Sequence, residues 1–156
     1  RDEDGRYLGH NGGETRNVHD QLHQIWRGMA DEGAISEEQY RNGTVLNFYK
    51  SPEEFMAPLK DEGSAPYKNG LRLVDERTVY VKCPYRRRWN DDGDTAAFAS
   101  GLMATIRSWS RHSFASAAGD AAADTVYSRL EQRIAEAPSE WSLDYVEHHQ
   151  MMEKVA

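Results

Sequence analysis

The feature that most constrains the fold is a pair of strand-like segments, far apart in a chain otherwise patterned for helices. Residues 71–83, LRLVDERTVYVKC, alternate apolar and polar side chains at both ends and contain four β-branched residues, which is typical of a β-strand. The charged pair Asp75-Glu76 leaves open whether this segment is one strand or two short ones bent at that point. Residues 142–153 have room for one last strand. Because a stable sheet usually needs about three strands or more, we expect both segments to join a larger sheet.

The first helix is predicted by one apolar stripe. Large apolar residues recur at helical spacing over residues 17–32, namely Val18, Leu22, Ile25, Trp26 and Met29. Gly33 follows directly and is placed to end the helix in the left-handed conformation.

Two capping boxes predict the next helices. Ser36 is followed by Gln39, and Ser51 by Glu54, so each pair can exchange side-chain and main-chain hydrogen bonds at a helix start. Pro52 suits the first helical position. We expect a short helical turn after Ser36 and a helix that begins at Pro52 and ends near residue 63.

The second half of the chain predicts two longer helices. PYRRRWNDDGD, residues 84–94, is interpreted as a loop. A helix capped by Asp94 or Thr95 is expected to run to about Phe114, and another from near Asp120 to Pro138.

Residues 1–16, RDEDGRYLGHNGGETR, are predicted to be a flexible lead-in because they are polar and contain four glycines. A phosphate-binding loop is not supported there, since such a loop follows a strand and none precedes these glycines.

Composition narrows the class of protein. A length of 156 residues with 38% hydrophobic and 29% charged residues fits one globular domain with a real core. The net charge of -7 argues against a general nucleic-acid binder, which needs a basic surface. No apolar run reaches the length of a membrane span, and the first residues lack the apolar stretch of a signal peptide. One cysteine, Cys83, excludes an internal disulfide and favours a cytoplasmic location.

Three groups of residues are candidate sites by their chemistry alone. His19 and His23 are spaced i, i+4, close enough to share a metal ion, but Asp20 and not Glu follows the first histidine and no third ligand is evident. The alternative is that both are surface or groove histidines. The Arg86-Arg87-Arg88 run could bind a phosphate or carboxylate, or be a solvated loop. Cys83 has no identifiable histidine partner and is expected to be an inert thiol.

The order of motifs resembles the SABATH family, the plant-type methyltransferases that act on carboxylates of small acids or on ring nitrogens. MADEGAISEEQ, FYKSPEEF and KDEGSA stand where the family has a helix end, a linking segment and a second helix end. FASGLMATIRSWSRHSFASAAGDAAADTVYSRLEQRIAEAP is similar to the late helices of the family. The matching positions there are Met103, His112-Ser113-Phe114, Gly119 and Arg129. The resemblance covers roughly residues 14–155.

The resemblance implies an α/β fold made of a mainly helical cap and the last strands of a Rossmann-like methyltransferase sheet. Residues 17–156 would be the C-terminal methyltransferase segment. In the family an N-terminal half binds the cofactor S-adenosylmethionine, and the sheet is incomplete without it. This expectation explains the two isolated strands, which would join a sheet whose other strands lie outside residues 1–156. Those strands would belong either to the remainder of a longer enzyme or to another chain that completes the sheet. The segment alone is expected neither to bind the cofactor nor to catalyse.

The resemblance also implies four substrate-binding positions. His19 occupies the place of the family's carboxylate-binding indole and could donate a hydrogen bond from its imidazole. Val18 beside it would form part of the pocket wall. Met103 matches a methionine that packs on the substrate ring, and Trp141 falls near an aromatic that closes the pocket. No catalytic base is implied, because the nucleophile is already anionic and the reaction depends on positioning and desolvation. Family members often dimerise, which makes a homodimer a candidate assembly.

An alternative function is a catalytically inactive methyltransferase-like domain that acts as a structural or interaction subunit. Thr44-Val45-Leu46-Asn47 replaces the family's Phe-Asn-Ile-Pro segment, and His19 replaces an indole. The acceptor molecule is not identified by the sequence, and a nitrogen acceptor remains an alternative to a carboxylate.

Overall fold

The computed structural model describes residues 16–45 and 50–155. The predicted lead-in, apart from Arg16, and Leu46-Asn47-Phe48-Tyr49 of the linking segment lie outside these described residues. The chain forms two compact units, one helical and one built on a β-ribbon. The helical unit contains residues 16–45 and 82–143, and the ribbon unit contains residues 50–81 and 144–155.

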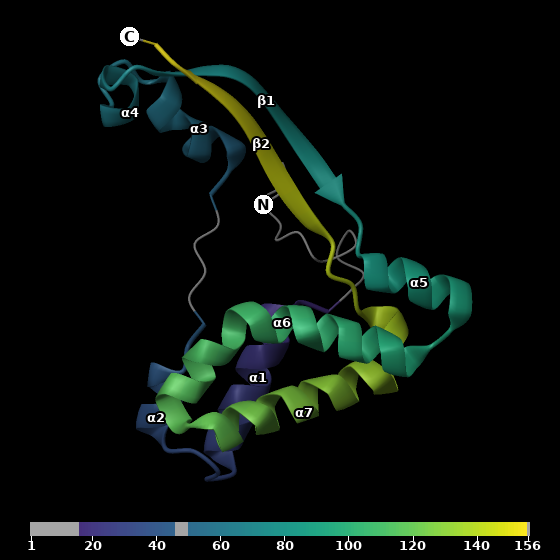
Figure 1. Cartoon of the computed structure of the whole chain (residues 1–156). Helices are drawn as coiled ribbons and strands as arrows, with labels where there is room; N and C mark the ends of the chain where they lie inside the picture. The colour runs from purple at the N-terminus through teal and green to yellow at the C-terminus, as the bar shows by residue number, and fades with distance from the viewer. Residues whose placement is uncertain (1–15, 46–49, 156) are drawn as a thin grey trace. The chain divides into compact units, whose positions relative to one another are not determined.

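The helical unit is built from five α-helices and one 3-10 turn among the described residues. They are α1 (Val18–Asp31), α2 (Glu37–Asn42), α5 (Pro84–Asp92), α6 (Thr95–Ala118), α7 (Asp120–Glu136) and η2 (Pro138–Glu140). α6 and α7 lie side by side as a hairpin (Figure 1). Gly119 joins them at a φ of 85°, a conformation that a side chain would strain.

The core of the helical unit is made by the apolar faces of α1, α6 and α7. Leu22, Ile25 and Trp26 of α1 pack with Leu102 and Ile106 of α6 and with three apolar residues of α7. These last are Val126, Leu130 and Ile134, each 0% exposed. The predicted stripe on α1 is confirmed, because all five of its residues are buried.

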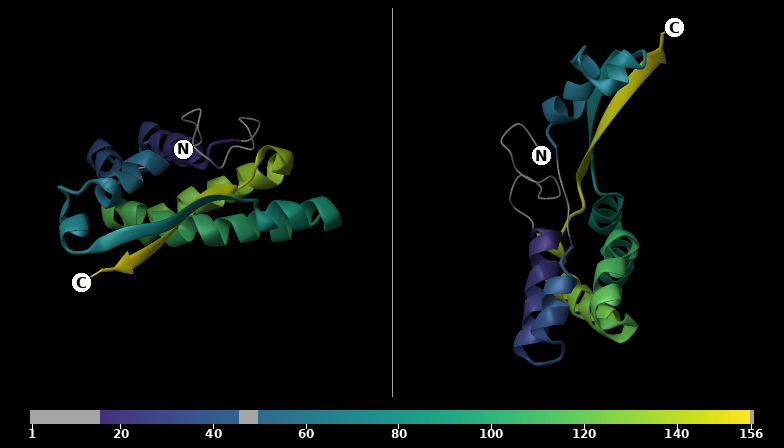
Figure 2. Two further views of the ribbon diagram at one scale, coloured as in Figure 1. Left: turned by 90° about the horizontal axis from the view of Figure 1, so that it is seen from above. Right: turned by 90° about the vertical axis from the view of Figure 1, so that its left-hand side faces the viewer.

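The ribbon unit contains α3 (Pro52–Lys60), α4 (Ala65–Lys68), β1 (Leu71–Val81) and β2 (Tyr145–Lys154). β1 and β2 pair antiparallel along their whole length, from Leu71 opposite Lys154 to Val81 opposite Tyr145. Figure 2 shows the two strands side by side as one twisted ribbon in two further views. The chain therefore combines α-helices with a small antiparallel sheet, which agrees with the expected mixture of helix and strand.

Most predicted element boundaries are confirmed. Both capping boxes form, since Ser36 and Ser51 accept from the main-chain N–H groups of Gln39 and Glu54 and receive the return bonds. Gly33 has a φ of 75° directly after α1.

Four details differ from the sequence prediction. The segment from residue 71 is one strand with a β-bulge between Leu73 and Asp75, not two strands bent at Asp75-Glu76. The helix expected to end near Phe114 continues to Ala118. α4 was not predicted, although Ser64 caps it and Pro66 lies in its first turn. The final strand begins at Tyr145, three residues later than expected.

The prediction of a loop over residues 84–94 was wrong, because residues 84–92 form α5. Cys83 caps this helix: its Sγ accepts from the main-chain N–H of Arg86 at 3.4 Å. Pro84 occupies the first position, and Gly93 ends the helix at a φ of 71°. A buried thiol is an unusual cap, and no Ser, Thr, Asp or Asn stands at this helix start to indicate it.

Candidate functional site

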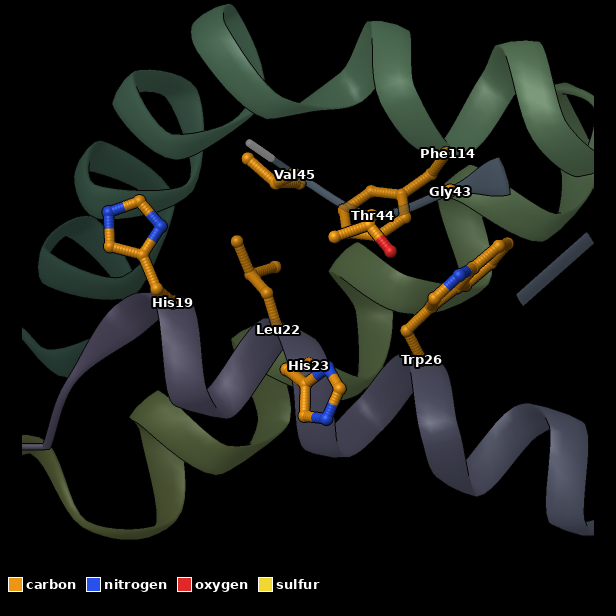
Figure 3. Close-up of a pocket in the computed structure, with 8 residues that line it drawn as sticks. All are labelled: His19, Leu22, His23, Trp26, Gly43, Thr44, Val45 and Phe114. Carbon is orange, nitrogen blue, oxygen red and sulfur yellow. The ribbon is translucent and has the colours of Figure 1, made fainter. Parts of the chain in front are cut away.

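A cavity of about 50 Å³ lies in the helical unit between α1, α6 and the residues that follow α2 (Figure 3). Its lining residues are His19, Leu22, His23, Trp26, Gly43, Thr44, Val45 and Phe114. Four of these come from successive turns of α1, as Figure 3 shows. The cavity therefore combines apolar walls with two imidazoles and one hydroxyl.

The Trp26 indole makes a fixed wall of the cavity. Its side chain is 2% exposed, and its Nε1–H donates to the Tyr40 carbonyl at 3.0 Å. The ring lies against Phe114, with centroids 4.9 Å apart. Gly43 permits this arrangement, because a Cβ there would lie 2.6 Å from the indole.

Contacts of one arginine, Arg27, hold α2 and the residues that follow it against α1. Arg27 donates to Asp31 and, across to α2, to Glu37, at 2.9 Å in each case. Its guanidinium also lies 4.2 Å from the centroid of the Tyr40 ring. The hydrogen bonds to Asp31 and then Glu37 raise the pKa of Arg27 above its ordinary value. The contacts of Arg27 thus fix α2 on α1. They thereby position Gly43 at the end of α2, and Gly43, Thr44 and Val45 form one wall of the cavity.

The two histidines lie one helical turn apart on α1. His19 is half-buried, and its ring centroid is 5.0 Å from that of Trp109, which is 40% exposed. His23 is exposed, with its Nε2 3.4 Å from the Tyr40 hydroxyl. A neutral imidazole carries one N–H donor and one acceptor nitrogen, so each ring can bind a carboxylate or a hydroxyl oxygen. Over residues 16–45 and 50–155, no group of three or more His, Cys, Asp or Glu side chains could hold a metal ion.

The structure separates the four residues predicted to bind substrate. His19 lines the cavity. Val18, Met103 and Trp141 lie in the hydrophobic core at 7%, 5% and 0% exposure and are not among the lining residues of this cavity. The Trp141 indole N–H has no hydrogen-bond partner among the described residues. Their contacts with a substrate stay a prediction, and of the four residues His19 lines this cavity.

The sequence pattern predicted only part of the cavity lining. Leu22 and Trp26 were recognised as members of the α1 stripe, and His23 as a neighbour of His19, which places them on one helix face. Nothing in the sequence pattern indicates that Gly43 or Phe114 would meet that face, because both contacts are tertiary. The one indication of this part of the cavity was the position of the linking segment, which the resemblance places beside the acceptor.

The basic run lies on α5 and not on a loop. Arg86 Nη1 donates to the carbonyls of Pro138, Ser139 and Trp141 at 2.8 to 2.9 Å. This guanidinium therefore stabilises the η2 turn. Its donors are used by the protein's own main chain and not by an external anion. Arg87 and Arg88 are exposed. Cys83, the cap of α5, is 2% exposed, which is the environment of a structural thiol.

No family model matches the sequence, and no curated protein matches it at a significant level. None of the helices in the described part of the chain has the length and apolar character to cross a membrane.

Proposed function

We propose that this chain is the acceptor-binding, C-terminal part of an S-adenosylmethionine-dependent methyltransferase that acts on a small carboxylic acid. The observation that carries the proposal is the place of His19. The sequence resemblance assigns this position to the group that binds the acceptor carboxylate, and His19 borders a cavity with apolar walls. The antiparallel pairing of β1 with β2 gives further support, because these are the segments assigned to the end of the methyltransferase sheet.

The residues of the cavity bind and orient the acceptor. The imidazole of His19 donates an N–H to one carboxylate oxygen, and His23 at the neighbouring turn offers a second donor. Leu22, Val45 and Phe114 contact the carbon skeleton and exclude water. Removing water from a carboxylate while leaving one oxygen free makes that oxygen a better nucleophile, and holding it in line with an electrophile lowers the entropic part of the barrier. No side chain here has to accept a proton.

The junction between β1 and α5 supports the assignment of the cofactor to another part of the enzyme. β1 leads through Lys82 and Cys83 directly into α5, whose first residue is Pro84. A glycine-bearing turn between a strand and a helix is what lets a main chain approach a nucleotide-type ligand closely. We therefore assign cofactor binding to another part of the enzyme and derive no step through it from this chain.

The cavity limits what the acceptor can place inside it. A cavity of roughly 150 Å³ holds benzene, and this cavity measures about 50 Å³. It accommodates a carboxylate with a short tail, so the ring of an aromatic acid would extend beyond the residues that line it.

The proposal is tested with the full-length product of the coding sequence that contains residues 1–156. Transfer of a labelled methyl group from S-adenosylmethionine is measured over a panel of small carboxylic acids. His19→Leu removes the donor and is expected to lower kcat/KM about tenfold or more, the effect of one hydrogen bond to a charged group. His19→Asn keeps an N–H donor and should retain part of the activity. His112→Leu is the matched control, because His112 is exposed on α6 and does not line the cavity.

Two results would contradict the proposal. One is a full-length protein that is folded but neither binds S-adenosylmethionine nor methylates any acid in the panel. The other is micromolar binding of S-adenosylmethionine to residues 1–156 alone, measured by calorimetry, because this part is assigned the acceptor only.

The second candidate function, an inactive domain that acts as an interaction subunit, is favoured by one observation. The ribbon unit exposes Tyr80, Tyr145, Met151 and Met152 at 47% or more, as a surface used for association would. Absence of a cofactor-binding part in the full-length protein would favour this candidate over the methyltransferase.

A further inference from the structure

The cavity of the helical unit has a buried floor and a rim that solvent reaches. Three lining side chains are at most 2% exposed and form the floor, namely Leu22, Trp26 and Phe114. The rim contains His19, which is half-buried, and His23, which is exposed. Figure 3 shows the two imidazoles and the two aromatic rings on different parts of the same cavity. A small ligand would therefore place a polar group at the imidazoles and an apolar tail on the floor.

Phe114 is the floor residue that is held from two sides. On one side its ring lies against Trp26, with centroids 4.9 Å apart, and the Trp26 indole is itself fixed by its hydrogen bond to the Tyr40 carbonyl. On the other side the Tyr127 ring meets Phe114 edge to face, with centroids 6.2 Å apart. The Tyr127 hydroxyl in turn lies 2.8 Å from that of Ser110. The phenyl ring therefore cannot turn aside for a longer ligand without disturbing close-packed neighbours.

The volume of the cavity sets the length of the tail that it can enclose. The cavity measures about 50 Å³, roughly a third of the 150 Å³ that holds the six carbons of benzene. In proportion, a tail of about two or three carbon atoms fits. A longer tail would extend past the rim into water, where its additional methylenes would leave no water and gain nothing.

The rim is suited to a carboxylate. Each imidazole can present an N–H donor, and the two rings are one helical turn apart on α1, at His19 and His23. Among the described residues that line the cavity, none is Asp, Glu, Lys or Arg. A bound carboxylate would therefore meet hydrogen-bond donors without a neighbouring acidic group to repel it.

We propose that Phe114 determines which acids this site accepts, and that it limits them to aliphatic carboxylic acids with about two or three carbon atoms beyond the carboxyl group. That the bound acid is the methyl acceptor rests on the proposed function. The length limit does not, because it follows from the buried floor and the volume of the cavity.

The test measures the binding of a homologous series of acids to the full-length protein without added cofactor. Acetate, propionate, butyrate, hexanoate and octanoate are titrated at one pH and ionic strength, and each Kd is taken from saturation-transfer NMR. In the wild type each added methylene should lower Kd about fourfold as far as butyrate, the gain of burying one methylene. Hexanoate and octanoate should bind no more tightly than butyrate.

Three variants identify the residue that sets the limit. Phe114→Leu deepens the floor and should let the gain in affinity continue to hexanoate. Phe98→Leu is the matched control, because Phe98 is also on α6 and 2% exposed but does not line the cavity; it should keep the wild-type limit. Val45→Phe fills the cavity from a half-buried position, so it creates no hole in the core, and it should weaken butyrate more than acetate.

The inference is overturned if no acid binds, if Kd keeps falling through octanoate in the wild type, or if Phe114→Leu leaves the limit unchanged. It is also overturned if Phe98→Leu moves the limit as Phe114→Leu does, or if alcohols of the same length bind as tightly as the acids. Methyl transfer is measured separately in the same protein. Acids that bind with the expected limit but are not methylated would reject the proposed function and leave the inference standing, whereas methylation without any length limit would do the reverse.

Discussion

Replacing Gly43 with alanine should destabilise the helical unit through one contact, that with the Trp26 indole. Gly43 has a φ of -91° and a ψ of 14°, which alanine adopts without strain, so the main chain is not the cause. The added Cβ would lie 2.6 Å from Cζ2 and Nε1 of Trp26. The indole cannot move away cheaply, because it is held by the hydrogen bond to Tyr40 and by the ring of Phe114.

The magnitude follows from these contacts. Overpacking a well-filled core costs about 1–3 kcal/mol, and weakening the buried hydrogen bond of Trp26 adds about 1 kcal/mol. We expect a loss of about 2–4 kcal/mol in the free energy of unfolding. The assay is urea unfolding followed by tryptophan fluorescence. All four tryptophans of the chain lie in the helical unit, so the signal reports that unit alone.

Gly28→Ala is the control for the general effect of adding a methyl group. Gly28 lies inside α1 and has nothing within 4 Å of its would-be Cβ. Alanine there should stabilise the unit by up to about 1 kcal/mol through helix propensity. The clash is isolated by repeating Gly43→Ala in a Trp26→Phe background, where the smaller ring leaves room. Equal costs in the two backgrounds, or an unchanged urea midpoint in the wild-type background, would refute the reasoning.

Two further substitutions test the packing of the helical unit. Arg86→Ala should cost about 2–4 kcal/mol in urea unfolding, because three main-chain carbonyls lose a charged donor, whereas the exposed Arg87→Ala should stay within about 0.5 kcal/mol of wild type. Tyr127→Phe should cost about 1 kcal/mol, because the Tyr127 hydroxyl lies 2.8 Å from that of Ser110. Burial raises the pKa of Tyr127, against a smaller opposing effect of the Ser110 hydrogen bond. The wild type should therefore lose stability as pH rises above about 10, and Tyr127→Phe should show a smaller loss in the same range.

The parts of the fold that were predictable are those encoded by neighbouring residues. The stripe of α1, the capping boxes at Ser36 and Ser51 and the left-handed Gly33 each depend on residues within a few positions of one another. The interactions that stabilise these features join residues that are near one another in the sequence, so the sequence pattern indicated the features directly. The bulge in β1 was not predicted, because the alternative suggested by Asp75 and Glu76 was a bend between two strands and the structure has one strand with a register shift between Leu73 and Asp75.

The parts that were not predictable depend on tertiary contacts. α5 begins at a buried cysteine cap, and its arginine is satisfied by carbonyls that lie more than 50 residues further along the chain. The cavity is formed where Gly43 meets Trp26 and Phe114, residues without a shared local pattern. His19 was selected through the resemblance, and its ring contact with the 40% exposed Trp109 is a further tertiary contact.

The long-range pairing of the ribbon has a consequence for the order of folding. All of residues 82–144 lie between the last residue of β1 and the first residue of β2. Closing so long a loop costs entropy before any strand contact forms, and such non-local pairing is slow. Formation of α5, α6 and α7 reduces that cost, and the Arg86 bonds bring the start of α5 to the residues that lead into β2. We expect the helices to form first and the ribbon to pair last, so a variant that loosens the Arg86 bonds should slow the appearance of strand structure more than that of helix.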